Sequence, residues 1–172
     1  MVNDISELHC NNAGLILCHP FLIELFKTND YLDVRHCFKN TDNQIRAVLL
    51  LNFMANGKDY NLNSLDLIIQ KLLCGMPINH TLPDHITLST TEKKSALELL
   101  EALIGHWKSL KQSNINVLRD QFLRRPGLLR FNNTCELAIQ NNTIDILLDN
   151  VPWDINRITL PWLPKMILVT WR

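Results

Sequence analysis

The sequence predicts an α+β fold that is mainly α, with about five helices followed by a small C-terminal antiparallel β-hairpin or sheet. Apolar residues recur at helical spacing through the first three quarters of the chain, and the period changes to two from Cys135 onward. Apolar residues make up 47% of the 172 residues and charged residues 20%, so the chain can bury a core. We expect one domain, 1–172, with a helical part at 1–127 and a β-hairpin and Pro-Trp segment at 128–172.

The first two helices are predicted by their end signals. Pro20 suits the first turn of a short helix, because proline has no N–H to donate and its φ angle is already helical. Asp42 is a candidate N-cap for a helix over 43–56, and Gly57 suits the C-terminal end of that helix. This second segment is apolar almost all round, which is typical of a central, buried helix.

Three further helices follow. Apolar residues at helical spacing from Leu65 to Leu73 predict the third, which Gly75 and Pro77 close. Ser89 and Glu92 form a possible capping box for a fourth helix over 90–110. Ser113 is a candidate cap for a fifth helix that runs through Arg125 and ends at Pro126-Gly127.

Alternating residues after the last helix predict strands. The segments Cys135–Gln140 and Ile144–Asp149 both alternate, and Asn141-Asn142 between them has turn chemistry, so a β-hairpin is the simplest interpretation. Ile167, Val169 and Trp171 predict a closing strand. Because an isolated hairpin is only marginally stable in water, we expect these strands to pack on the helices or on another chain.

Four leucines on the predicted apolar faces are expected in the core. They are Leu50, Leu72, Leu100 and Leu103. Replacing a buried leucine with alanine costs about 2 to 5 kcal/mol of stability, so each replacement is expected to destabilise the fold by that amount.

Charge and cysteine content limit the partners and the compartment. Seventeen basic and 17 acidic side chains give a net charge of zero, so no global field draws the protein to nucleic acid or to an anionic membrane. The five cysteines are odd in number and contain no C-x-x-C pair, which favours reduced thiols. Asp4 and Glu7 stand where a signal peptide carries positive charge, and no apolar run approaches ~18 residues. Neither an export signal nor a membrane span is expected.

Three neighbouring Cys-His pairs leave a zinc site open as an alternative. They are His9-Cys10, Cys18-His19 and His36-Cys37. Their spacings do not match compact zinc sites, so placement in the core or on the surface is the favoured interpretation. The sequence contains no nucleophile elbow, phosphate-binding glycine loop or H-E-x-x-H motif, so we expect neither catalysis nor a cofactor.

Many short sequence motifs, in a fixed order along the chain, give this protein a resemblance to a known family. They are Asn12-Ala13-Gly14-Leu15, His19-Pro20-Phe21-Leu22, Arg46-Ala47-Val48, Asn56-Gly57, Lys71-Leu72-Leu73-Cys74-Gly75, His106-Trp107-Lys108-Ser109-Leu110-Lys111, Leu118-Arg119, Phe122-Leu123, Asp145-Ile146-Leu147-Leu148-Asp149 and two Pro-Trp steps. In this order and spacing, over nearly the whole chain, they resemble the conserved C-terminal region of contractile injection system tape measure proteins.

The resemblance implies a structural role in a bacterial, phage-tail-like particle. It implies that this protein binds inner tube, spike or hub, or baseplate proteins, and that it is cytoplasmic during assembly, with incorporation into the particle left open. Tape measures of this family carry long N-terminal extensions, whereas here the match begins near Met1. The longest predicted helix, about 20 residues, spans only ~30 Å, so this sequence alone is expected to be either the anchoring end of a ruler or a short relative. The runner-up is a zinc-binding or effector-like domain carried by the same kind of particle.

Six residues are candidates for partner contacts. They are Trp153 and Trp162 in the two Pro-Trp steps, Trp171 near the C-terminus, and the basic residues Arg119, Arg124 and Arg125. Tryptophan is enriched among interface hot spots, and a basic cluster can dock on an acidic ring of a protein tube or hub. The alternatives are indoles that cap the core and, for the arginines, a solvated helix face or a phosphate-binding patch, which the lack of interleaved aromatic residues disfavours.

Overall fold

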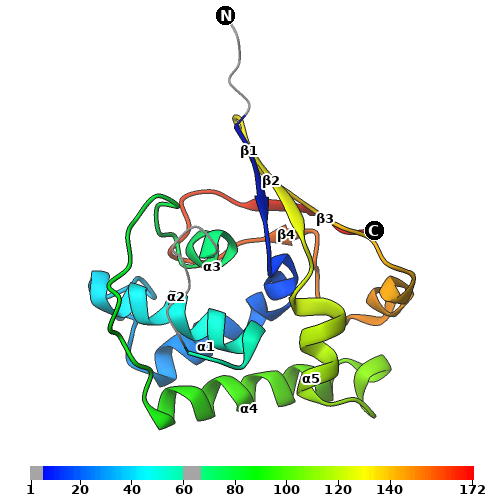
Figure 1. Cartoon of the computed structure of the whole chain (residues 1–172), viewed down its shortest axis with the longest axis horizontal. Coiled ribbons are helices and arrows are strands. Elements are labelled where there is room, and N and C mark those ends of the chain that lie inside the picture. Colours follow the sequence, from blue (N-terminus) through cyan, green and yellow to red (C-terminus); the bar gives the residue numbers. More distant parts are fainter. Residues whose placement is uncertain (1–5, 60–66) are drawn as a thin grey trace, which may run out of the picture.

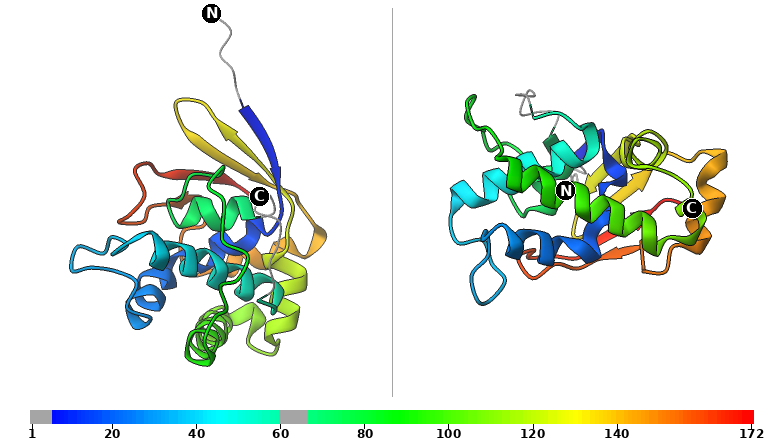
Figure 2. Two further views of the ribbon diagram at one scale, coloured as in Figure 1. Left: turned by 60° about the vertical axis from the view of Figure 1, so that its left-hand side comes forward. Right: turned by 90° about the horizontal axis from the view of Figure 1, so that it is seen from below.

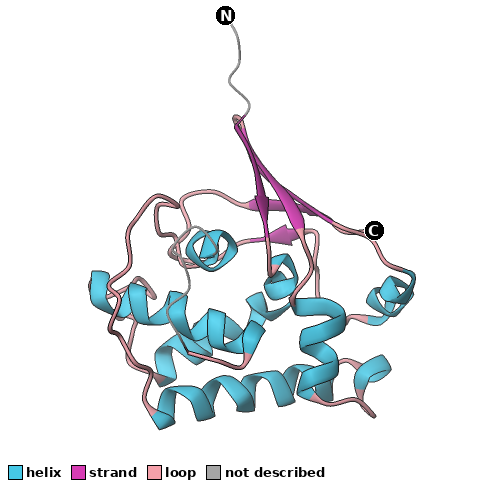
Figure 3. Ribbon diagram, in the orientation of Figure 1, coloured by secondary structure: helices cyan, strands magenta, loops and turns pink. Residues whose placement is uncertain are grey.

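A mixed five-stranded sheet rises from a layer of helices (Figures 1 and 3). The computed structural model describes residues 6–59 and 67–172. The helices are α1 (His19–Thr28), α2 (Thr41–Asn56), α3 (Ile68–Leu73), α4 (Thr90–His106) and α5 (Ile115–Leu118), with single turns or short helices η1 (Ala13–Cys18), η3 (Lys108–Leu110), η4 (Arg119–Leu123) and η5 (Thr143–Asn150). The strands are β1 (Ser6–Cys10), β2 (Gly127–Phe131), β3 (Cys135–Ile139), β4 (Arg157–Ile158) and β5 (Ile167–Thr170).

The predicted end signals of two helices are confirmed. Ser89 Oγ accepts a hydrogen bond from the Glu92 N–H at 3.1 Å, and Glu92 Oε2 accepts one from the Ser89 N–H at 2.7 Å, so the capping box at α4 is complete. Gly57 ends α2 with φ 70°, a left-handed conformation that favours glycine. The α4 helix stops at His106 rather than at residue 110, because Trp107 leaves the helical conformation.

Two predicted N-caps are each displaced to a nearby asparagine. Asn40, not Asp42, caps α2, since its Oδ1 accepts from the Asn43 N–H at 2.9 Å. Asn114, not Ser113, caps α5 in the same way. The third predicted helix is observed from Ile68, and Leu65 lies outside the described residues.

The predicted β-hairpin between Cys135–Gln140 and Ile144–Asp149 is wrong. The β3 strand does form, but it pairs antiparallel with β2 and parallel with β5, while residues 143–150 form η5. Asn142 and Asp145 make a capping box that starts this helix, with the Asp145 carboxylate accepting from the Asn142 N–H at 2.8 Å. A turn-forming asparagine followed three residues later by an acid is also a helix-start signal, and here that signal prevails over the alternation.

The sheet is larger and differently connected than the sequence predicts. Its strand order is β1-β2-β3-β5-β4, and β3 with β5 is the parallel pair among antiparallel neighbours, so the sheet is mixed. The closing strand predicted at Ile167–Trp171 is confirmed as β5. The N-terminal β1 strand was not predicted, because its five residues include only two apolar positions, Leu8 and Cys10.

One apolar cluster joins the helices to the inner face of the sheet. Leu50, Leu100 and Leu103 are fully buried, as predicted. Leu72 is only half-buried and packs at the margin of the cluster, which corrects its assignment to the core. The close approach of η1 to η4 requires Gly14, because a Cβ atom there would lie 1.7 Å from the Phe122 carbonyl oxygen.

The leucine positions give a graded stability prediction. Leu100→Ala and Leu103→Ala are each expected to lower the free energy of unfolding by about 2 to 5 kcal/mol, because each leaves a cavity in a buried helix face. Leu72→Ala serves as the matched variant and is expected to cost less, since Leu72 is half-buried. Chemical denaturation curves measure all three, and equal losses for Leu72 and Leu100 would contradict this core assignment.

Candidate partner-binding site

Residues 152–164, here called the Pro-Trp strap, run along helix α1. Trp153 packs edge-on against Phe21 near the start of α1, with ring centroids 5.3 Å apart and an interplanar angle of 83°. Trp162 packs against Phe26 near the other end of the same helix, at 5.4 Å. Both indoles are half-buried. The strap thus closes the core over α1 and leaves part of each indole at the surface.

Trp162 joins the strap to two further elements. Its Nε1 donates a hydrogen bond to the Leu73 carbonyl oxygen at the end of α3, at 2.8 Å. Its ring also packs against Phe38, at a centroid distance of 5.3 Å. At the other end of the strap, His19 Nε2 donates to the Asp154 carbonyl oxygen at 2.7 Å, and burial lowers the pKa of His19. The strap is therefore held at both ends by directional contacts.

Trp171, the third candidate indole, lies inside the protein. It is 1% exposed, and the Arg125 guanidinium carbon lies 5.8 Å from its ring centroid. Within the described residues, the Nε1 atoms of Trp171 and Trp153 are buried without a hydrogen-bond partner. A buried indole can support a surface but cannot itself contact a partner.

Two of the candidate arginines bind the C-terminal carbonyl groups of α2. Arg119 Nε donates to the Met54 carbonyl oxygen at 2.8 Å, and Arg124 Nε donates to that of Ala55 at 3.1 Å. A cation at a helix C-terminus satisfies carbonyls that lack intrahelical partners and interacts favourably with the helix dipole. Arg119 is buried, which lowers its pKa, while the Arg124 side chain is 43% exposed and pairs with Asp120 at 2.9 Å.

The third arginine, Arg125, forms a buried ion pair. Its two terminal nitrogens contact the two carboxylate oxygens of Asp145 at 3.0 and 2.5 Å, and one of them also donates to the Gln140 carbonyl oxygen at 2.8 Å. Both side chains are buried. The three arginines therefore do not form one exposed basic patch, and Arg124 is the one with a substantially exposed side chain.

An apolar pocket of about 310 Å³ lies beside the strap. The β2–β3 turn extends beyond the helical layer (Figure 1). Phe131, Cys135 and Ile167 form one row across β2, β3 and β5 and line the pocket, with Phe131 half-buried and the other two buried. The end of α3 and the turn after Trp162 complete the walls. Lys165 is the one charged side chain in this lining, which comprises Leu72, Gly75, Met76, Pro77, Phe131, Asn132, Thr134, Cys135, Leu163, Pro164, Lys165 and Ile167.

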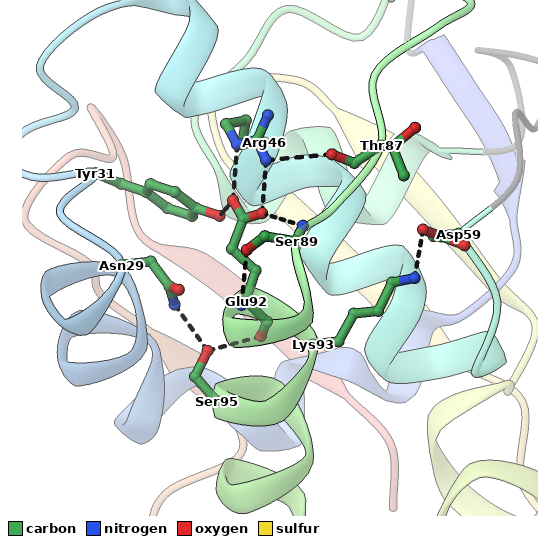
Figure 4. A network of polar contacts seen from close by, with 9 residues as sticks. All are labelled: Asn29, Tyr31, Arg46, Asp59, Thr87, Ser89, Glu92, Lys93 and Ser95. Atoms are coloured by element: carbon green, nitrogen blue, oxygen red, sulfur yellow. Dashed lines mark hydrogen bonds and ion pairs between the residues drawn. The ribbon is translucent and has the colours of Figure 1, made fainter.

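A buried carboxylate joins α2, α4 and the loop after α1 (Figure 4). Glu92 on α4 accepts hydrogen bonds from Arg46 Nε of α2, at 2.7 Å, and from the Tyr31 hydroxyl of the loop after α1. Burial alone raises the pKa of Glu92, but the hydrogen bonds from Arg46, Tyr31 and the Ser89 N–H outweigh burial and lower this pKa to about 2. Burial and the contact with Glu92 also raise the pKa of Tyr31. The capping motif indicated Glu92 in the sequence, whereas nothing local indicated Tyr31 or Arg46.

The cysteines near the N-terminus differ in burial. Cys10 and Cys18 are buried, and burial raises the pKa of these thiols to about 11 and about 12. Cys37 is exposed. In the part of the chain that the structure describes, no three side chains of His, Cys, Asp or Glu gather as a set of metal ligands.

Across residues 6–59 and 67–172, no helix combines the length and the apolar character needed to cross a bilayer.

The helical layer and the mixed sheet, joined by one apolar cluster, define an α+β protein. The sequence model of the contractile injection system tape measure protein family matches residues 2–171, so the chain belongs to this family. The family resemblance that the short sequence motifs indicated is therefore confirmed. The family is one of structural proteins rather than of enzymes. Comparisons with curated proteins and with solved structures found no match.

The Glu92 contacts predict a pH-dependent stability. Glu92 has an ordinary pKa of 4.5 and a folded-state pKa of about 2, so its contribution is fully present above pH 4.5 and is lost as the pH falls through 2. Glu92→Gln is expected to lower the free energy of unfolding at pH 7 by up to about 3 kcal/mol. It should also flatten the pH dependence of stability between pH 5 and 2, as measured by denaturation at each pH.

Glu98→Gln is the matched control, because Glu98 is an exposed glutamate on the same helix. An exposed substitution of this kind usually changes stability by less than about 0.5 kcal/mol. Equal pH profiles for the two variants would show that the Glu92 contacts do not stabilise the fold.

Proposed function

We propose that this protein is a non-enzymatic assembly component of a contractile injection particle that acts by binding inner tube, spike or hub, or baseplate proteins. The observation that carries the proposal is the family match over residues 2–171. The proposed mechanism is recognition: a folded surface holds the protein at one place in the growing particle. Assembly then takes place in the cytoplasm, and no cofactor takes part.

The contact surface proposed is the outer side of the Pro-Trp strap. Trp153 and Trp162 combine buried ring atoms with exposed ones, and their positions are set by Phe21, Phe26 and the Leu73 carbonyl oxygen. A side chain that is already ordered loses little conformational entropy on docking, which favours affinity. The prolines at 152 and 161 are exposed, and they restrict the backbone on either side of each indole.

The other four candidates fit this proposal in different ways. Arg124 retains exposed area next to Asp120 and can contact a partner directly. Arg119, Arg125 and Trp171 are buried, so any effect on binding would arise through the elements that they hold in place. Truncating one of them removes a structural contact before it removes a partner contact.

Trp153 and Trp162 are expected to contribute more to partner binding than to folding. Trp153→Ala and Trp162→Ala are each expected to weaken a complex by ~30-fold, because a hot-spot residue contributes about 2 kcal/mol or more. The measurement is the dissociation constant for each purified tube, spike and baseplate protein encoded beside this gene, together with the melting temperature of each variant.

Trp107→Phe is the control for lost indole packing. Trp107 is fully buried, and its Nε1 donates to the Leu147 carbonyl oxygen at 3.0 Å, so this variant should melt earlier yet bind normally when folded. If the strap variants also melt far earlier while their folded fraction binds like wild type, the strap is a structural element only. Absence of binding by the wild-type protein to every particle protein would refute the proposed function.

A further inference from the structure

The loop 30–39 between α1 and α2, here called the Val34 loop, is ordered by its own hydrogen bonds. Asp33 Oδ1 accepts from the N–H groups of Arg35 and Cys37, at 2.8 and 3.1 Å. The Asp33 N–H in turn donates to the Cys37 carbonyl oxygen at 2.8 Å. Val34, at the tip, is 98% exposed. The tip is thus a defined turn that presents an apolar side chain to solvent.

The base of the Val34 loop is anchored in the core. Tyr31 and Leu32 are buried. Leu32 and Phe38 form an isolated antiparallel β-bridge across the base of the loop, and the Phe38 ring packs on Trp162. His36 has φ 59°, a left-handed conformation that is unfavourable for a residue other than glycine and persists where surrounding contacts enforce it. Because the loop is already ordered, a partner that binds its tip does not have to order it first.

The loop and the apolar pocket have complementary chemistry. The tip carries Val34 between the exposed residues Asp33 and Arg35. The hydrogen bonds from the backbone of Cys37 and Arg35 lower the pKa of Asp33, so its carboxylate is ionised at neutral pH. The pocket of about 310 Å³ is apolar, and the one charged group in its lining is Lys165. Among the described residues, no carboxylate forms an ion pair with Lys165. An apolar tip with an adjoining carboxylate therefore suits an apolar pocket with a cationic rim.

The loop and the pocket lie on either side of Trp162. Phe38 at the base of the loop packs on the Trp162 ring, and Leu163, Pro164 and Lys165 directly after Trp162 line the pocket. In both views of Figure 2, the loop, in blue, and the turn before β5, in orange-red, lie at the same side of the molecule. A twofold axis near Trp162 would therefore let two copies exchange both contacts at once, which is the arrangement of an isologous dimer.

We propose that two copies of this chain pair through these features, with the Val34 loop of each copy inserted into the apolar pocket of the other and Asp33 facing Lys165. A single exposed valine is ordinary on a protein surface. Here an ordered apolar projection and a matching pocket occur on one chain, and a projection complementary to a pocket on the same molecule drives self-association.

The pairing is tested by sedimentation equilibrium of the purified full chain. Wild type is expected to dimerise reversibly in the micromolar range, and Val34→Asp to raise the dimer dissociation constant at least ~30-fold by placing a charge at the centre of the contact. Val34→Asp should melt like wild type, because the side chain is 98% exposed. Ile146→Asp is the matched control: Ile146 is 60% exposed on η5, at the opposite side of the molecule from the loop (Figure 1), so this variant should still dimerise.

A mixing experiment tests whether loop and pocket contact each other. The double variant Pro77→Glu/Lys165→Glu changes two exposed residues of the pocket and is expected to be monomeric, like Val34→Asp. A mixture of the two variants restores one intact loop-in-pocket contact per pair and should form heterodimers that neither variant forms alone. Failure of the mixture to associate, or dimerisation of Val34→Asp alone at wild-type strength, would overturn the proposal.

Cys37 provides a second readout in the same loop. Cys37 is exposed and the four other cysteines are buried, so a maleimide reagent should label Cys37 selectively. Labelling of wild type is expected to slow as the protein concentration rises through the dimer dissociation constant, and labelling of Val34→Asp to stay fast. If protection of Cys37 appears only on addition of a purified tube, spike or baseplate protein, the loop binds that protein and the dimer is rejected.

Discussion

The buried ion pair between Arg125 and Asp145 joins the helical part of the protein to the sheet and to η5. Arg125 lies between the last helical turn and β2, while Asp145 starts η5, and the same guanidinium contacts the end of β3 and the ring of Trp171 after β5. Two buried charges require each other, because removing one leaves the other unpaired at a cost of about 3 to 5 kcal/mol. The pair therefore brings the end of the helical part, the sheet and η5 to one point.

The ion pair also explains why residues 143–150 do not extend the sheet. A strand at this position would alternate Ile144, Ile146 and Leu148 on one face, but Asp145 must point inward to meet Arg125. The helical turn buries Asp145 and Leu148 together and leaves Ile146 outside, 60% exposed. The place beside β3 is then taken by β5, which arrives from the C-terminal strap and is consequently parallel.

The chemically distinctive side chains of this protein serve mainly to hold it together. Arg119 and Arg124 bind the end of α2, Glu92 joins α2, α4 and the loop after α1, and the strap indoles cover α1. At the surface, the features with exposed apolar groups include the Val34 loop, the apolar pocket and the outer side of the strap. These features carry the contacts proposed above for this member of a structural family.

The sequence by itself determined the features that depend on neighbours along the chain. Periodicity and end signals predicted α1, α2, α4 and β5, and the order of short sequence motifs predicted the family. The tertiary structure alone decided the pairing of β1 with β2, the parallel β3–β5 pair and the burial of Arg119 and Arg125, because their partners lie far away in sequence, as Met54 does from Arg119. A short polar strand such as β1 forms because it can hydrogen-bond to the backbone of β2. An arginine side chain can be buried only where carbonyl oxygens or a carboxylate accept its hydrogen bonds. No local pattern encodes either condition, since both depend on where distant segments come to lie.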